Sequence, residues 1–269
     1  MVKVREFQDQ DVVEAAKDRL RHVWETFDSL AVMFSGGKDS LVALHLVKQI
    51  AAEYGQETVN VVFRDEELIP DSVVDFVEEY RTADWTRFWW YCYPLKSQKF
   101  VLGITRDYIQ WDPNREHCRP MPDHAIRAKD GKVRDQYTMD AEVAANFKGK
   151  VGLVTGIRAA ESLMRFRASV NKLNENYINT PTHEKGKPAP KNVKLIKPIY
   201  DWQESDVFKW LHESGIRHCP VYEHQLYAGQ PLRVSTPVHA ECAKTLHRLP
   251  AFAPKLYEQI MDVFPEMHV

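Results

Sequence analysis

Residues 30–47 of this 269-residue chain read LAVMFSGGKDSLVALHLV, and they combine three local patterns. Residues 30–34 form an apolar run of the kind found in buried parallel strands. From Asp39 onward, apolar residues recur at the spacing of a helix. The residues between these two patterns therefore form a turn that joins a strand to a helix: Ser35, Gly36, Gly37, Lys38, Asp39 and Ser40.

The composition of this turn suits an anion. Two adjacent glycines carry no Cβ atom, so a ligand can approach the main-chain N–H groups closely. The helix that follows adds its own unpaired amides and the positive end of its dipole. We therefore expect the turn to bind phosphate groups, and a nucleotide is the ligand that this arrangement favours.

Two common phosphate-binding motifs are excluded by the letters of the sequence. The Walker motif places a glycine five residues before its Gly-Lys pair and a serine or threonine after the lysine, but here Val32 and Asp39 stand at those positions. The chain also contains no GxGxxG sequence. The turn therefore represents another class of phosphate site.

Composition indicates a globular protein. Hydrophobic residues make up 44% of the chain and charged residues 28%, and no apolar run approaches the ~18 residues that cross a bilayer. The polar N-terminus does not resemble a secretory signal, so we expect a cytoplasmic protein that does not enter a membrane. The formal net charge of −2 argues against a general nucleic-acid binder, although it leaves a nucleic-acid acceptor open.

The four cysteines, Cys92, Cys118, Cys219 and Cys242, include no CxxC pair, and the two closest are 23 residues apart. This spacing argues against a zinc ribbon or a redox dithiol. It also disfavours an iron–sulfur cluster, which would need all four scattered thiols.

Further apolar runs predict strands over residues 58–63, 86–93, 150–157 and 193–199, alternating with helices. With the first strand, they predict an α/β, Rossmann-like fold with a five-stranded, mostly parallel sheet. We expect a nucleotide-binding domain over residues 1–200, in which residues 94–145 form an inserted, lid-like segment. Residues 201–269 should form a small helical C-terminal cap.

Charged residues follow the second predicted strand, where parallel sheets place their ligands. Arg64 and Asp65 should therefore face the nucleotide, and Asp65 or Glu66 could hold a nucleoside or a metal; a solvated acidic loop is the alternative. The inserted segment carries cationic side chains that suit an anion-binding lid, unless they are simply surface residues: Arg115, His117, Arg119, His124 and Arg127.

The fourth predicted strand leads into Thr155, Gly156 and Arg158. On a helix, Arg158, Glu161 and Arg165 would share one face, and the glutamate could hold both arginines in place. Guanidinium groups bind two phosphate or sulfate oxygens at once, so we interpret this segment as the second half of the anion site. A purely structural cluster of ion pairs is the alternative.

Three segments carry a family resemblance. SGGKDS, TGIRAAESLMR and KPIYDWQESDVFKWL are similar to sequences of the PP-loop ATP pyrophosphatases, in particular the phosphoadenylyl-sulfate (PAPS) reductase-like branch. WDPNREHCRPMP resembles the reductase-like proteins of phages and mobile elements, including the immunoglobulin-binding regulator type. The resemblance implies an adenine nucleotide alpha hydrolase-like fold with an adenine nucleotide at residues 35–40. It also implies a ParB-like partner, and it leaves a homo-oligomer open.

The cysteine of the reductases lies in a Glu-Cys-Gly-Leu-His segment, whereas here Glu241 and Cys242 are followed by Ala-Lys-Thr. Three functions therefore remain. The first cleaves ATP at its α-phosphate with Lys38, Arg158 and Mg²⁺ on Asp39 or Asp65. The second is a reductase or sulfurtransferase that acts on PAPS or adenylyl sulfate through Cys242. The third is a regulatory protein that senses a nucleotide without turnover.

Overall fold

The computed structural model describes residues 8–170, 175–181, 191–240 and 242–268. A mixed sheet of seven strands lies at its centre, in the order β6-β3-β2-β1-β7-β9-β8. All neighbouring pairs are parallel except β8 and β9, which are antiparallel. The strands of this sheet are β1 (Ser29–Met33), β2 (Val59–Arg64), β3 (Thr86–Cys92), β6 (Ile126–Arg127), β7 (Val151–Val154), β8 (Ile178–Asn179) and β9 (Val193–Ile196).

A second, two-stranded antiparallel sheet is formed by β4 (Leu95–Val101) and β5 (Ile104–Gln110). The α-helices are α1 (Val12–Thr26), α2 (Lys38–Glu53), α3 (Asp71–Arg81), α4 (Gln136–Ala144), α5 (Leu163–Val170), α6 (Glu204–Glu213), α7 (Val221–Tyr227) and α8 (Pro254–Val263). Three 3₁₀ segments complete the list: η1 (Ala159–Glu161), η2 (Ala243–Ala251) and η3 (Pro265–Met267). None of the described helices is both long enough and apolar enough to cross a membrane.

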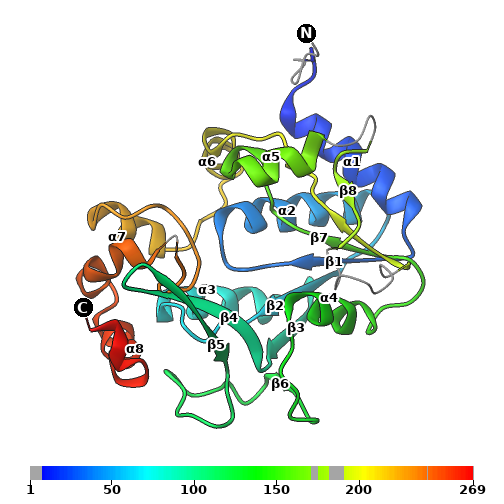
Figure 1. Ribbon diagram of the computed structural model, residues 1–269. Coiled ribbons are helices and arrows are strands. Elements are labelled where there is room, and N and C mark those ends of the chain that lie inside the picture. The colour runs from blue at the N-terminus through cyan, green and yellow to red at the C-terminus, as the bar shows by residue number, and fades with distance from the viewer. Residues whose placement is uncertain (1–7, 171–174, 182–190, 241, 269) are drawn as a thin grey trace.

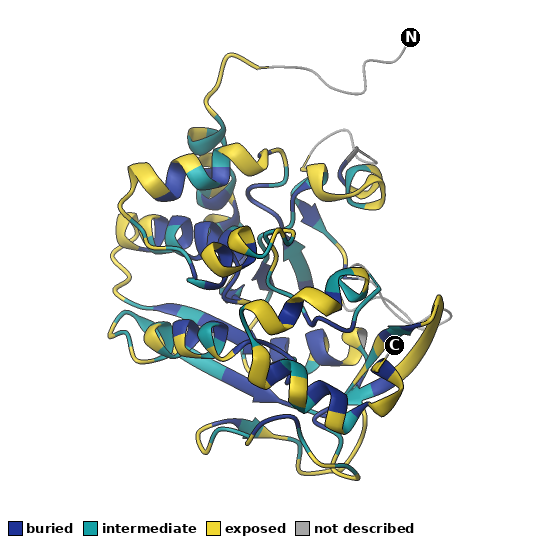
Figure 2. Ribbon diagram, turned by 90° about the vertical axis from the view of Figure 1, so that its left-hand side faces the viewer, coloured by how far each residue is buried: buried dark blue, intermediate teal, exposed yellow. Residues whose placement is uncertain are grey.

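The two faces of the sheet are covered by different helices because side chains alternate along each strand. Val32 and Val61 point to the face where α1, α2, α3 and α6 pack, and together they form the largest core cluster. Ala31 and Val62 point to the opposite face, where α4 packs through Met139. Figure 2 shows the buried strands between helices whose outer surfaces are exposed.

The strand order creates a crevice at the carboxyl ends of β1 and β7. From β1 the chain proceeds outward through β2 and β3, and it then returns to the other side of β1 to add β7 and β9. The loops after β1 and β7 therefore begin side by side where the strand order reverses, which is the position where open α/β sheets bind ligands. Residues 35–37 and 155–158 line this position.

The α/β class and the five predicted parallel strands are confirmed, whereas the predicted strand number is too low. The two additional strands, β6 and β8, have two residues each, which is too short to produce a periodic signal. The predicted lid segment also contains regular structure, namely the β4–β5 hairpin and α4. The hairpin turns through Leu102 and Gly103, both at positive φ, without the Asn-Gly or Asp-Gly signature of such turns.

The segments after residue 200 divide between two cores. Trp202 and Tyr222 belong to the main core beneath the sheet. Leu249 and Ile260, from η2 and α8, instead form a second cluster with Tyr108 of the β4–β5 hairpin. In Figure 1, α7 and α8 lie beside this hairpin at one end of the molecule. The inserted segment and the C-terminal region therefore pack on each other.

Candidate functional site

The turn after β1 is held together by its own serines. Gly36 has φ +76°, and a Cβ atom there would come within 3.1 Å of the Val73 side chain of α3. The Ser35 amide donates to Ser40 Oγ at 3.2 Å, and the Ser40 hydroxyl donates to the Gly37 carbonyl at 2.9 Å. These bonds stabilise the turn where α2 begins.

Gly156 brings the second predicted segment against this turn. A Cβ atom at Gly156 would lie 2.4 Å from the carbonyl carbon of Asp39 and 2.5 Å from the amide nitrogen of Ser40. Only glycine allows the end of β7 to approach the main chain of α2 this closely. The two predicted halves of the anion site are therefore in direct contact.

Asp39 links two buried cations at this contact. Its Oδ1 accepts a hydrogen bond from Arg158 Nε at 2.5 Å, and its Oδ2 lies 3.3 Å from Lys38 Nζ. Lys38 Nζ also lies 3.1 Å from a carboxylate oxygen of Glu204 and donates to the Leu232 carbonyl at 3.0 Å. Lys38 and Arg158 are each only 4% exposed. Two positive charges thus flank the N-terminus of α2.

The prediction that Arg158, Glu161 and Arg165 share one face of a helix is wrong. Arg158 is extended, with φ −113° and ψ 142°, and it precedes the 3₁₀ turn η1. Glu161 nevertheless contacts both arginines, because it accepts from the Arg158 amide at 2.9 Å and pairs with the Arg165 guanidinium. Thr155 faces away from the turn: its amide and hydroxyl both donate to the Ile196 carbonyl.

Tyr222 of α7 is a site residue that the sequence did not reveal. Its hydroxyl accepts a hydrogen bond from the Lys38 amide at 2.7 Å. It would also lie 3.3 Å from a Cβ atom placed on Gly37. Burial raises the pKa of Tyr222, so the phenol stays protonated. Its 184-residue separation from Lys38 explains why no local pattern indicated the contact.

Arg64 and Asp65 lie at the end of β2, but each is engaged by another side chain. Arg64 forms a 3.0 Å ion pair with Asp140 of α4. Burial raises the pKa of Asp140, and the Arg64 charge opposes that rise. Asp65 pairs with Arg119 and accepts from Trp90 Nε1 at 2.9 Å. The structure thus places Asp65 in a buried network and not at the turn.

The predicted cationic lid is likewise committed to carboxylates. Glu67 is fully buried and binds Arg115 through both of its oxygens, at 2.7 and 2.6 Å. Arg119, as noted, binds Asp65. Two of the five predicted lid cations therefore hold the inserted segment to the end of β2. Across the described stretches of chain, no three His, Cys, Asp or Glu side chains are grouped as metal ligands would be.

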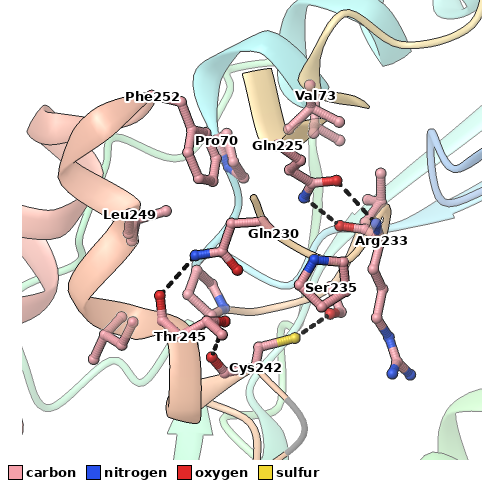
Figure 3. A pocket seen from close by; sticks show the side chains of 15 residues that line it. Pro70, Val73, Gln225, Gln230, Arg233, Ser235, Cys242, Thr245, Leu249 and Phe252 are labelled. Atoms are coloured by element: carbon pink, nitrogen blue, oxygen red, sulfur yellow. Dashed lines mark hydrogen bonds between the residues drawn. The ribbon is translucent and has the colours of Figure 1, made fainter. Parts of the chain in front are cut away.

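Cys242 lines a pocket beside the turn (Figure 3). Its Sγ atom lies 3.1 Å from Ser235 Oγ, and it is the only one of the four cysteines that is not fully buried. Two wall residues also face the glycines: Val73 faces Gly36, and Val234 lies 3.6 Å from a Cβ atom placed on Gly37. Glu241, the residue that precedes Cys242 in the sequence, lies outside the described residues.

The other thiols are placed for packing. Burial raises the pKa of Cys118 to about 12 and that of Cys219 to about 11, so both stay protonated near neutral pH. The Cys92 thiol donates to Asp65 at 3.6 Å, and burial raises its pKa as well.

Comparisons with known proteins place this geometry in a family. The phosphoadenosine phosphosulfate reductase domain matches residues 124–258. The chain is 28% identical over 233 residues to YbdN, an uncharacterized protein of Escherichia coli K12. That match covers 83% of this chain and spans only 57% of the relative's length.

Among solved structures, FMN adenylyltransferase of Candida glabrata has a similar fold, with a TM-score of 0.52 and 14% identity. The similarity covers 82% of this chain and 63% of that one. A structure of the same enzyme in complex with ATP gives a TM-score of 0.51, with the same identity and coverage. Because the reductase domain matches half of its residues, this chain belongs to the phosphoadenosine phosphosulfate reductase domain family.

Proposed function

We propose that the protein is an enzyme that binds ATP at residues 35–40 and cleaves it at the α-phosphate. The observation that carries this proposal is the bridge through Asp39, which holds the Lys38 ammonium and the Arg158 guanidinium beside the N-terminus of α2. Cations fixed next to a helix N-terminus bind phosphate oxygens without further rearrangement of the main chain. A fold neighbour whose structure is a complex with ATP supports an adenine nucleotide as the ligand.

In the proposed reaction, an acceptor oxygen attacks the α-phosphorus and forms an O–P bond. The bond from that phosphorus to the β-phosphate oxygen breaks, and pyrophosphate leaves with the electron pair. Negative charge on the phosphate oxygens is then stabilised by Lys38, Arg158 and the amides of the turn. Such stabilisation is strong here because both side chains are shielded from water.

The two predicted metal ligands, Asp39 and Asp65, do not fit a resident Mg²⁺ ion. Both oxygens of Asp39 are already paired with cations, and those of Asp65 bind Arg119 and Trp90. Magnesium needs one or two carboxylates with free oxygens. We therefore assign the charge stabilisation to the cationic side chains of the chain itself.

The test is the Lys38→Ala variant, assayed for pyrophosphate and AMP release from ATP. Loss of one such contact costs ~3 kcal/mol of barrier, so turnover should fall on the order of a hundredfold. Lys209→Ala is the matched control, because the Lys209 side chain is 72% exposed on α6. Unchanged pyrophosphate release by Lys38→Ala refutes the proposal. Tight ATP binding by the wild-type protein without either product identifies a regulatory, non-catalytic role instead.

A second candidate function is supported by the pocket around Cys242. A thiolate there would attack the sulfur of adenylyl sulfate or PAPS, forming an S–S bond while the nucleotide phosphate leaves. An external thiol would then release sulfite. Cys242→Ser should abolish sulfite formation, whereas Cys219→Ser, in the core, should retain it. Thermal-shift screening against ATP, adenylyl sulfate and PAPS separates the two candidates before any turnover assay.

A further inference from the structure

Three consecutive acidic residues follow β2, and the middle one has a different environment from its neighbours. Asp65 and Glu67 each pair with an arginine of the inserted segment. Within the described parts of the chain, Glu66 forms no ion pair with any Lys or Arg side chain. Its Oε2 accepts a 3.3 Å hydrogen bond from the Thr236 amide. The carboxylate of Glu66 is thus directed toward the C-terminal segment.

Buried polar atoms without a partner surround this carboxylate. Tyr108 Oη, Gln110 Oε1 and Thr236 Oγ1 form no hydrogen bond of good geometry to any described group, although the three side chains lie within reach of one another. These three residues are only 7%, 3% and 4% exposed, respectively. Burying such an atom without a hydrogen bond costs on the order of 1–3 kcal/mol each. Three of them at one place indicate that a polar group with its own donors and acceptors belongs there.

The hairpin register explains why these atoms converge. Ser97 of β4 pairs directly with Tyr108 of β5, and Gln110 lies two residues further along, so all three point to one face of the hairpin. Burial raises the pKa of Tyr108; hydrogen-bonding contacts with the Thr236, Ser97 and Gln110 side chains oppose that rise, and the Glu66 charge adds to it. The hairpin and the C-terminal segment therefore enclose Glu66 from two sides.

The C-terminal segment also connects this cluster to the phosphate turn. Val234 lies 3.6 Å from a Cβ atom placed on Gly37, and the Thr236 amide contacts Glu66. Two residues of chain span at most about 7 Å, so one short segment contacts both the turn and Glu66. The parallel pairing of β1 and β2 also places the loops after these strands side by side, because Met33 pairs with Val62 just before both loops.

We propose that Glu66 is the general base for the nucleophilic oxygen, which Tyr108, Gln110 and Thr236 hold in place. This inference rests on the proposed cleavage of ATP. The acceptor is a hydroxyl-bearing group, of which water is the smallest. Its proton passes to the Glu66 carboxylate as its oxygen bonds to the α-phosphorus, and pyrophosphate leaves. Of the two carboxyl oxygens of Glu66, only Oε2 accepts a hydrogen bond from a described group, which leaves Oε1 for this step.

The electrostatic surroundings support a proton-accepting role. Burial raises the pKa of Glu66. The Arg64 charge and the hydrogen bond from the Thr236 amide lower this pKa, but by less. Asp65 raises the pKa further, and His239 lowers it. A carboxylate with a raised pKa is a stronger base than an exposed one, which brings it closer to the pKa that catalysis at neutral pH requires.

The test compares Glu66→Gln with the wild-type enzyme in pyrophosphate release from ATP, with water as the acceptor. General bases contribute about 10²–10⁴-fold, so we expect at least a hundredfold loss of kcat with an unchanged Kd for ATP. Glu66→Ala leaves a space, and sodium formate should restore part of its activity, which a merely structural role would not allow. Glu213→Gln, an exposed residue of α6, is the matched control.

The outcomes separate this inference from the proposed function. If Lys38→Ala is inactive but Glu66→Gln turns over at the wild-type rate, Glu66 is not the base and the α-phosphate chemistry stands. If the wild-type enzyme releases no pyrophosphate, both fail. A crystal structure of the full chain with a non-hydrolysable ATP analogue gives a second check: an ordered oxygen within about 2.6–3.2 Å of Glu66 and Tyr108 supports the subsite. Its absence overturns it.

Discussion

The contact between Gly156 and α2 can be tested by adding one methyl group. In Gly156→Ala, the new Cβ atom would lie 2.4, 2.5 and 2.6 Å from three main-chain atoms of Asp39 and Ser40. Non-bonded carbon atoms are most stable at about 3.5–4.0 Å, so the end of β7 and the start of α2 must separate by roughly 1 Å. Main-chain atoms at the start of a helix cannot rotate away as a side chain can.

Two separate losses follow from this displacement. Overpacking typically costs about 1–3 kcal/mol, and we expect the free energy of unfolding to fall by that amount. A shift of about 1 Å also misplaces Arg158 relative to Asp39, and misplacement of this size can cost roughly a hundredfold in rate. Urea denaturation measures the first loss, and calorimetric titration with ATP together with pyrophosphate release measures the second.

The same strand provides a matched control. In Gly152→Ala, the Cβ atom would meet the Leu30 Cδ2 atom at 2.7 Å, which is the flexible end of a side chain. This variant should lose stability while its affinity for ATP stays at the wild-type value. If Gly156→Ala keeps both its stability and its ATP affinity, the two segments do not form one site and the reasoning is wrong.

Three further predictions concern buried polar groups. Burial lowers the pKa of His45 to about 4, so below pH ~6.5 the unfolded chain binds a proton that the folded chain does not bind. Near pH 4.5 this difference should lower the free energy of unfolding by about 2.5 kcal/mol, as measured by urea denaturation. The His45→Gln variant should not show this loss. Asp65→Asn should cost about 3–5 kcal/mol by leaving Arg119 unpaired, and a double-mutant cycle with Arg119→Met should show strong coupling between the two positions. Tyr222→Phe should lower the free energy of unfolding by about 1–3 kcal/mol, because the buried Lys38 amide loses its acceptor.

The part of the site built from consecutive residues could be predicted from the sequence. The apolar run, the glycine pair and the helical spacing within residues 30–47 encode their own strand, turn and helix. The segment that contacts this turn could be predicted because Gly156 and Arg158 directly follow an apolar strand. In both places the signal and the structure it specifies lie within about ten residues, where periodicity and glycine are informative.

The partners of charged side chains could not be predicted in this way. Arg115 and Arg119 have the composition of an anion-binding lid, and only the fold reveals that Glu67 and Asp65, 48 and 54 residues away, already bind them. The sequence shows that a side chain is charged, but it does not show which group pairs with that charge in the fold. The β4–β5 hairpin was missed for a related reason, since its buried residues Val101 and Tyr108 pack on the C-terminal region, which is more than 100 residues away in the sequence.

The C-terminal segment contacts the groups on which both proposed reactions depend. Along residues 235–236, the Ser235 hydroxyl contacts Cys242, whereas the next residue, Thr236, donates its amide to Glu66. The thiol and the carboxylate thus contact adjacent residues of one segment that also touches the turn. A hydroxyl acceptor needs only Glu66 and a sulfur transfer needs only Cys242, so single substitutions on either side of this segment distinguish the two reactions without changing the phosphate site they share.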